Sequence, residues 1–124
     1  MRPQELRERT KHFALETIAL FRRLPNSPEY KDIGRQLYRC ANSMAANYRA
    51  AGRARSHAEF AAKIGSVREE ADEAQHWMLV LSAIGLRDER WPWLAQESTE
   101  LTRIFEASYR TASSNYSTQR RTRR

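Results

Sequence analysis

The fold is decided by the stretch Ser43–Glu59, SMAANYRAAGRARSHAE, in which one long helix ends and the next begins. Ser43 and Asn47 stand four residues apart and therefore share one face of the first helix. Gly52 follows the last periodic residue, so we expect it to adopt the left-handed conformation that ends a helix. Ser56, with a glutamate three residues later, forms a capping box, which marks a new helix start. The stretch therefore predicts a helical hairpin.

Apolar residues repeat every three or four positions on both sides of this hairpin, which is the spacing of a packed helix face. The repeat is strongest in the third helix, at Phe60, Ile64, Val67, Ala71, Ala74, Met78 and Leu81. Together with the predicted caps at Ser27 and Ser56, the spacing predicts helices at about 3–24, 28–51, 57–84 and 93–113. Long helices and short loops favour an all-α fold, an antiparallel up-and-down four-helix bundle over residues 1–116.

Positive charge gathers on the second helix, at the hairpin tip and in the last residues of a chain whose net charge is +7. Residues 117–124 contain no apolar side chain, so we expect a disordered basic tail. Arginine bonds two phosphate oxygens at once, which predicts a phosphate-backbone surface. The candidate residues are Arg35, Arg39, Arg49, Arg53, Arg55, Arg120, Arg121, Arg123 and Arg124. The alternative is surface charge paired with acidic residues, with a solubilising tail.

Other polar residues favour structural roles. Ser43 and Asn47 are interpreted as structural polar residues, with the Asn47 amide fixing helix register or bonding a loop carbonyl. Cys40 is the only cysteine and is expected to be a buried thiol. Glu73 and His76 form one Glu-x-x-His pair, whereas di-iron bundles need two such pairs and two further glutamates. The sequence therefore predicts no catalytic residue, no metal and no cofactor.

The chain is expected to reside in the cytoplasm without a membrane partner. Its N-terminus lacks the apolar core of a signal peptide, and a single cysteine fits a reducing compartment. The longest apolar stretch, Trp77–Leu86, is too short to cross a bilayer. Because residues 77–84 are apolar nearly all round, this part of the third helix is expected to need a further neighbour, such as another subunit.

A resemblance to a known family covers residues 21–86 closely and the flanking helices loosely. The shared elements are the turn at 25–30, Gln36 and Leu37 followed by Ser43 and Asn47, the Gly52-Arg53 turn, Ser56 before Phe60, and a glutamate-rich helix ending in Gly85-Leu86. In these elements the chain resembles the bacterial four-helix-bundle proteins encoded in intervening sequences of large-subunit (23S) ribosomal RNA genes. The resemblance is specific for the family and not for a function.

The resemblance implies a homo-oligomer, because members of this family form ring-like pentamers of bundles. A related branch serves as the accessory protein of the reverse transcriptase in diversity-generating retroelements. RNA or DNA and a reverse transcriptase are therefore the implied partners. The chain departs from the commoner family motif, with Met44, Ala45, Tyr48 and Ala50 in place of Ile, Pro, Ile and Glu. These departures imply an unkinked second helix and a more basic tip.

Three hypotheses follow from the sequence. The leading one is a non-enzymatic, oligomeric protein that associates with nucleic acid through phosphate contacts. The second is an oligomeric protein–protein scaffold that binds no nucleic acid. An enzyme or metal protein is a distant third, since no catalytic residue carries over from the family.

Overall fold

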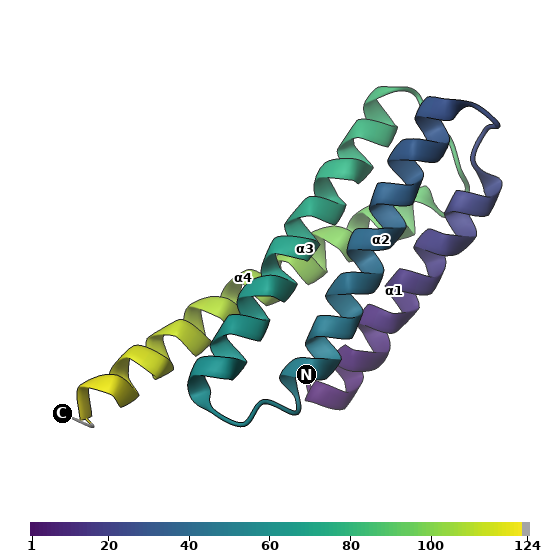
Figure 1. Cartoon of the computed structure of the whole chain (residues 1–124). Helices are drawn as coiled ribbons and strands as arrows, with labels where there is room; N and C mark the ends of the chain where they lie inside the picture. The colour runs from purple at the N-terminus through teal and green to yellow at the C-terminus, as the bar shows by residue number, and fades with distance from the viewer. Residues whose placement is uncertain (123–124) are drawn as a thin grey trace.

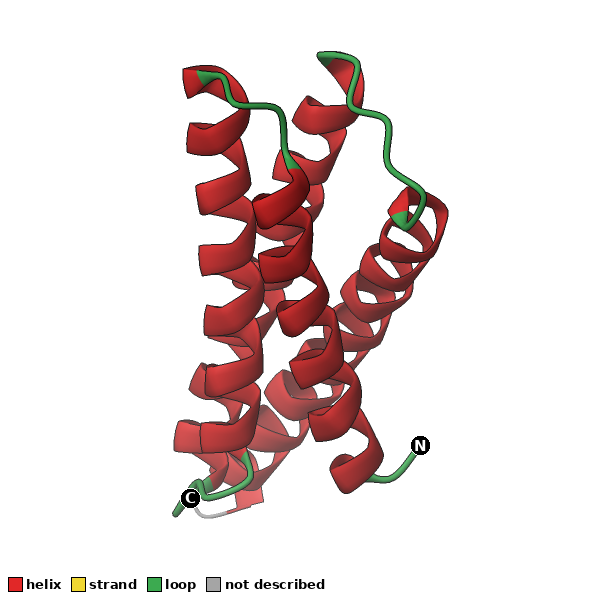
Figure 2. Ribbon diagram, turned by 90° about the vertical axis from the view of Figure 1, so that its right-hand side faces the viewer, coloured by secondary structure: helices red, strands yellow, loops and turns green. Residues whose placement is uncertain are grey.

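The computed structural model describes residues 1–122, and these form helices joined by short loops without any strand (Figures 1 and 2). The helices are α1 (Pro3–Arg23), α2 (Pro28–Ala51), α3 (His57–Ala83) and α4 (Trp91–Thr122). The predicted all-α fold is confirmed, and three of the four helices end within a residue of their predicted bounds. The second helix is unbroken from Pro28 to Ala51, as its departure from the family motif implies.

The predicted caps form at the starts of α2 and α3. The Ser27 hydroxyl accepts a hydrogen bond from the Tyr30 backbone N–H at 3.4 Å. The Ser56 hydroxyl accepts one from the Glu59 backbone N–H at 3.0 Å. Each bond satisfies a donor that the first turn of a helix leaves without an intrahelical partner.

Gly85 ends α3 in the left-handed conformation, with a φ of 98°. The Leu86 N–H donates to the Leu81 carbonyl at 3.0 Å, and the Gly85 N–H donates to the Ser82 carbonyl at 3.1 Å. These two bonds form a Schellman motif, which satisfies the last carbonyls of the helix. A side chain at Gly85 would be strained, because only glycine adopts this φ at low cost.

The expectation of a left-handed Gly52 is wrong, since its φ is −64° and its ψ is −12°. The chain leaves α2 by tightening the last turn instead. The Arg53 N–H donates to the Ala50 carbonyl at 3.0 Å, and the Ala54 N–H donates to the Ala51 carbonyl at 3.1 Å. These bonds satisfy the terminal carbonyls without a positive φ.

Each helix packs against the next one along the chain, and α4 touches α1 over a shorter length (Figure 1). This order is that of an up-and-down bundle. The buried core takes large side chains from all four helices, including Phe13, Leu20, Leu37, Met44, Ile64, Leu81, Leu94, Leu101 and Phe105. The predicted α3 seam is buried except for Phe60, which is 38% exposed. Phe60 lies in the first turn of α3, where it borders the surface groove between α3 and α4.

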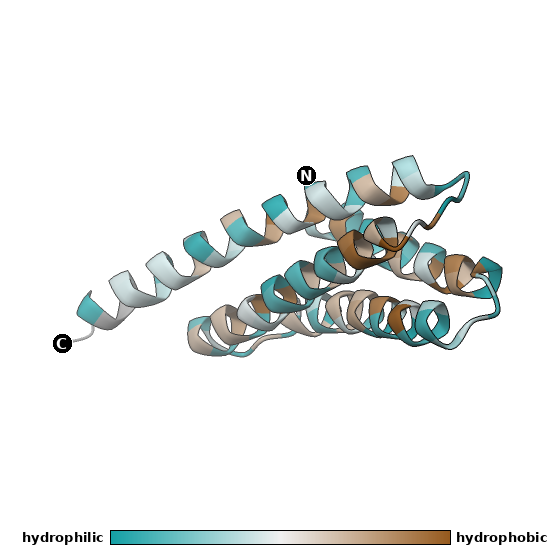
Figure 3. Ribbon diagram, turned by 90° about the horizontal axis from the view of Figure 1, so that it is seen from above, coloured by the Kyte–Doolittle hydropathy of each residue, from teal (hydrophilic) through white to brown (hydrophobic). Residues whose placement is uncertain are grey.

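Helix α4 continues to Thr122 and leaves the bundle at an angle (Figures 1 and 3). The sequence predicts a helix end near residue 113 and disorder from 117, but residues 117–122 are helical. No glycine or proline interrupts the chain after Pro92, and extending an existing helix adds one hydrogen bond for each residue fixed. Residues 123 and 124 lie outside the described part of the chain.

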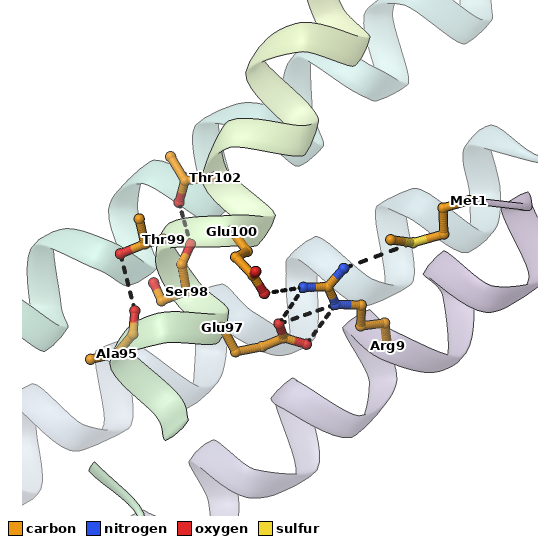
Figure 4. Close-up of polar contacts among 8 residues, drawn as sticks. All are labelled: Met1, Arg9, Ala95, Glu97, Ser98, Thr99, Glu100 and Thr102. Carbon is orange, nitrogen blue, oxygen red and sulfur yellow. Dashed lines mark hydrogen bonds and ion pairs between the residues drawn. The ribbon is translucent and has the colours of Figure 1, made fainter. Parts of the chain in front are cut away.

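The contact between α1 and α4 is held by charged side chains (Figure 4). The Arg9 guanidinium donates to both carboxylate oxygens of Glu97, at 2.7 and 2.9 Å, and also to Glu100. Arg23 pairs with Asp88 at 2.9 Å in the loop before α4, and its hydrogen bond lowers the pKa of Asp88. These ion pairs thus help to hold α4 and the loop before it to the first helix, which α4 touches over only a short length.

Candidate nucleic-acid interface

Three of the predicted arginines lie on α2, and all three are exposed to solvent at least in part. Arg35 pairs with Asp32 at 3.0 Å, and Arg39 donates to the Gln36 side-chain oxygen at 2.8 Å. Arg49 makes no ion pair with any residue that the structure describes. Exposed pairs within one helix are weak, so each of these guanidinium groups stays available as a phosphate ligand.

The loop between α2 and α3 adds two arginines, Arg53 and Arg55, and both are exposed. Arg55 lies 3.5 Å from the carboxylate of Glu59 in an exposed pair, whereas Arg53 makes no ion pair within residues 1–122. Positive charge therefore continues from the end of α2 around the tip of the hairpin. The tip is as basic as the sequence predicts.

Two cations from α1, Arg7 and Lys11, join Arg49 in a groove between α1 and α2 that the sequence analysis missed. The groove has a volume of about 430 Å³, and Asn42, Ala45, Ala46 and Glu8 complete its lining. A side-chain carbon added to Gly52 would lie 3.6 Å from Arg7 Nη1, so Arg7 reaches the hairpin tip. Arg7 and Lys11 stand four residues apart in the sequence and therefore share a helix face, which is the pattern from which their contribution could have been predicted.

Lys31 lies on the same face of α2 as Arg35 and Arg39, at the same spacing of four residues, but its side chain has a structural role. Its ammonium donates to the Phe21 backbone carbonyl at 3.0 Å and lies 4.6 Å from the Phe21 ring centroid. This contact places a cation at the last turn of α1, where free carbonyls favour positive charge. Lys31 therefore fixes the α1–α2 corner.

The start of α1, the α2–α3 loop and the end of α4 lie at one end of the molecule (Figures 1 and 2). Arg121 is exposed near the end of α4. The Arg120 side chain, Arg123 and Arg124 lie outside what the structure describes. The described arginines of the predicted set are thus accessible without forming one compact patch, because Arg35 and Arg39 lie toward the middle of α2.

The structural polar pair forms within α2. The Asn47 side-chain N–H donates to the Ser43 hydroxyl at 3.2 Å, which confirms that the two residues share a face. The amide therefore bonds within its own helix and not to a loop carbonyl.

Cys40 is fully buried, as predicted, and burial raises its pKa to about 12, with the nearby Glu73 carboxylate adding to the shift. Cys40, Glu70 and Glu73 place one ligand atom each within 4.8 Å of one another. His76 lies apart from this group, with its ring 4.9 Å from the Trp77 ring. Because the sulfur is fully buried in the core between α2 and α3, the arrangement suits a structural core thiol.

Part of the apolar end of α3 is uncovered. Leu79 is 66% exposed and Ile84 is 42% exposed, whereas Met78 and Leu81 are buried. None of the helices in the described residues has the length and apolar character needed to cross a membrane.

These features define an all-α protein built as a four-helix bundle with a basic end. The chain belongs to the family of 23S rRNA-intervening sequence proteins, whose model matches residues 3–107. A crystal structure of a protein of unknown function from the S23 ribosomal protein family of Bacteroides thetaiotaomicron is similar to it, with a TM-score of 0.78 and 24% sequence identity. The similarity covers 89% of this chain and 99% of that one, and it shows a shared fold without indicating a function. No curated protein matches the chain.

Proposed function

We propose that this protein is a non-enzymatic, oligomeric accessory protein that binds the phosphate backbone of RNA or DNA. The observation that supports the proposal best is the gathering of Arg7, Lys11, Arg49 and Arg53 at one end of the bundle. None of these four cations makes an ion pair within the described residues. Arg9, Arg23 and Arg90 differ from these four cations, because carboxylates neutralise them.

Unpaired cations favour a polyanionic partner for a physical reason. Each phosphate that a lysine or arginine neutralises releases a condensed counterion, which makes binding favourable and dependent on salt. Contacts of this kind position a protein on a nucleic acid without reading its bases. The expected binding is therefore weakly sequence-dependent, with Arg35, Arg39 and Arg55 as flanking contacts and Arg120–Arg124 as a further tether.

Self-association would strengthen such binding. The exposed Leu79 and Ile84 offer apolar surface that a second copy of the chain could cover. The family resemblance favours a pentamer, in which each subunit repeats the basic end and modest contacts add through multivalency. The same family resemblance makes a reverse transcriptase a candidate protein partner. A reducing cytoplasm, expected from the single cysteine, fits this role.

The test is fluorescence anisotropy with labelled RNA and DNA oligonucleotides across a salt series, paired with light scattering to measure the particle mass. The proposal predicts binding at low salt that weakens steeply as salt rises, and a mass above that of the monomer. Failure of both polymers to bind at low salt would rule out the nucleic-acid role.

The second candidate is a protein–protein scaffold without nucleic-acid binding. It is favoured by the exposed apolar residues of α3 and by the pairing of Arg35 and Arg55 with their own acidic neighbours. A multimer that ignores both polymers at low salt would support this alternative.

A further inference from the structure

The start of α3 presents an aromatic side chain to solvent beside the basic hairpin tip. Among the phenylalanines, tyrosines and tryptophans that the structure describes, only Phe60 is exposed. It belongs to the apolar repeat of α3, and the other members of that repeat are buried. A single exposed apolar residue is common on protein surfaces, so the meaning of Phe60 depends on what surrounds it.

Two hollows of the surface meet at Phe60. The first is a groove of about 430 Å³ between α3 and α4, where the small residues Ala107 and Ala112 of α4 line it together with His57 and Phe60. Helix α4 diverges from the start of α3 as it leaves the bundle (Figure 1). The second hollow lies over the α2–α3 loop and is lined by His57, Phe60 and Arg55 among others. Phe60 therefore lies where an uncharged groove meets the arginines of the tip.

The charge around Phe60 has one sign. None of the residues that line the two hollows is acidic, whereas the groove between α1 and α2 includes a glutamate. Arg53 makes no ion pair within residues 1–122, and Arg55 makes only an exposed pair with Glu59 at 3.5 Å. Because exposed pairs of this kind are weak, both guanidinium groups remain available to an anion. A ligand that matches the whole surface carries negative charge and an apolar group together.

A nucleic acid offers both properties at once only where its bases are unpaired. In a duplex, the bases stack on one another inside the helix and leave the phosphates outside, so arginines reach the charge but an aromatic side chain does not reach a base face. In a single strand, bases can stack on exposed aromatic side chains while a basic surface follows the backbone. Such stacking tolerates any sequence, because every base has a π face.

We propose that the α3–α4 groove receives an unpaired base of a single-stranded nucleic acid, which packs against Phe60 while Arg53 and Arg55 contact the neighbouring phosphates. The inference rests on the proposed function and specifies the form of the polymer. Thr111 and Asn115 also line the groove, and their side chains both donate and accept hydrogen bonds. They suit the edge of any base, in keeping with weak sequence preference.

The experiment compares fluorescein-labelled oligothymidine with a strand of equal length made of abasic sites, so that the phosphate charge is the same and only the bases differ. Anisotropy titrations at low salt give the two affinities. The wild-type protein is expected to bind oligothymidine at least about fivefold more tightly, which is the lower end of the range for one base stacked on an aromatic side chain.

Phe60→Leu removes the ring but keeps apolar bulk, and it should lose most of this preference for bases. Its affinity for a duplex of oligothymidine with oligodeoxyadenylate should stay within about twofold of the wild type, because duplex binding uses charge alone. Phe60→Trp restores a ring and should restore the preference. Leu15→Ala removes an exposed apolar side chain from α1, outside the groove, and is the matched control that should bind as the wild type does.

Circular dichroism and light scattering of each variant verify that the helices and the particle mass are unchanged. A lower particle mass for Phe60→Leu would overturn the inference, because the groove would then be an interface between copies of the chain. An equal loss of duplex affinity would overturn it as well, since Phe60 would then act by shaping the arginine tip.

The remaining outcomes separate this inference from the proposed function. Equal binding of the oligothymidine and abasic strands by the wild type would overturn the inference while leaving phosphate-backbone binding in place. A preference for bases that survives Phe60→Leu would also overturn it, because another part of the surface would then contact them. Failure to bind any of the strands at low salt would overturn the proposed function itself.

Discussion

Arg9 of α1 and Glu97 of α4 form a two-pronged ion pair, with the guanidinium donating to both carboxylate oxygens (Figure 4). Glu97 is buried, and Arg9 is three-quarters covered. Paired forks of this geometry are stronger than single-point ion pairs. The pair ties α4 to the first helix along the edge where the bundle has its shortest contact.

Replacing Glu97 with glutamine should destabilise the fold by about 1–3 kcal/mol, because the partly buried guanidinium loses a carboxylate partner and the amide offers only one oxygen to accept its hydrogen bonds. Urea denaturation followed by circular dichroism measures the change in the free energy of unfolding. Glu5→Gln removes the exposed Arg2–Glu5 pair and is the matched control, with an expected destabilisation below about 1 kcal/mol. Equal destabilisation by the two variants would show that the α1–α4 pair is no stronger than a surface contact.

Two glycine-to-alanine substitutions should have different effects on the stability of the fold. Gly85→Ala places a side chain at a φ of 98° and should cost about 1–2 kcal/mol of stability. Gly52→Ala occupies an ordinary helical conformation with contacts no closer than 3.4 Å, so it should be neutral or slightly stabilising. Thermal unfolding of the two variants makes the comparison, and a more harmful Gly52→Ala would contradict the described turn.

Cys40 should resist alkylation by iodoacetamide at pH 8 in the folded protein and react readily in urea. Burial raises its pKa to about 12, so the reactive thiolate is scarce in the native state. The raised pKa also makes the free energy of unfolding depend on pH. The folded state favours the protonated thiol, so the stabilising contribution of Cys40 is fully present below the ordinary thiol pKa of about 8.5. It should decline as the pH rises from there toward 12. Mass spectrometry of the labelled protein reads the result, and rapid labelling of folded protein would disprove burial.

The fold is largely predictable because helix starts and core faces are local signals. The serines at 27 and 56 cap as predicted, and the three- and four-residue repeat of α3 is buried apart from Phe60. The end of α4 escapes prediction because polar composition indicates disorder, although nothing after Pro92 interrupts a helix. The conformation of Gly52 is not predicted correctly because a tightened turn satisfies the neighbouring carbonyls as well as a left-handed glycine would.

The candidate site is only partly predictable. The arginines of α2 and the hairpin tip stand out in the sequence as a basic run. The contribution of Arg7 and Lys11 depends on α1 lying beside the end of α2, which is a long-range relationship. The charge pairs of α1 with α4, such as Arg9–Glu97, join residues far apart in the chain, so local patterns do not predict them.

The central claim is that unpaired charge at the hairpin end binds the nucleic-acid backbone, and one measurement tests it most directly. Anisotropy titrations across a salt series should compare the wild type with the triple variant Arg49→Ala, Arg53→Ala, Arg55→Ala. The matched control triple is Arg22→Ala, Arg87→Ala, Arg103→Ala, which removes the same charge from arginines outside the proposed surface. We predict that the first triple weakens RNA binding and lowers the log–log salt slope by about two, at about 0.7 for each phosphate that is no longer neutralised on a single strand. The control triple should keep most of the affinity and slope. Equal reductions in the two triples would contradict a localised binding surface, and no binding by the wild type would contradict the account as a whole.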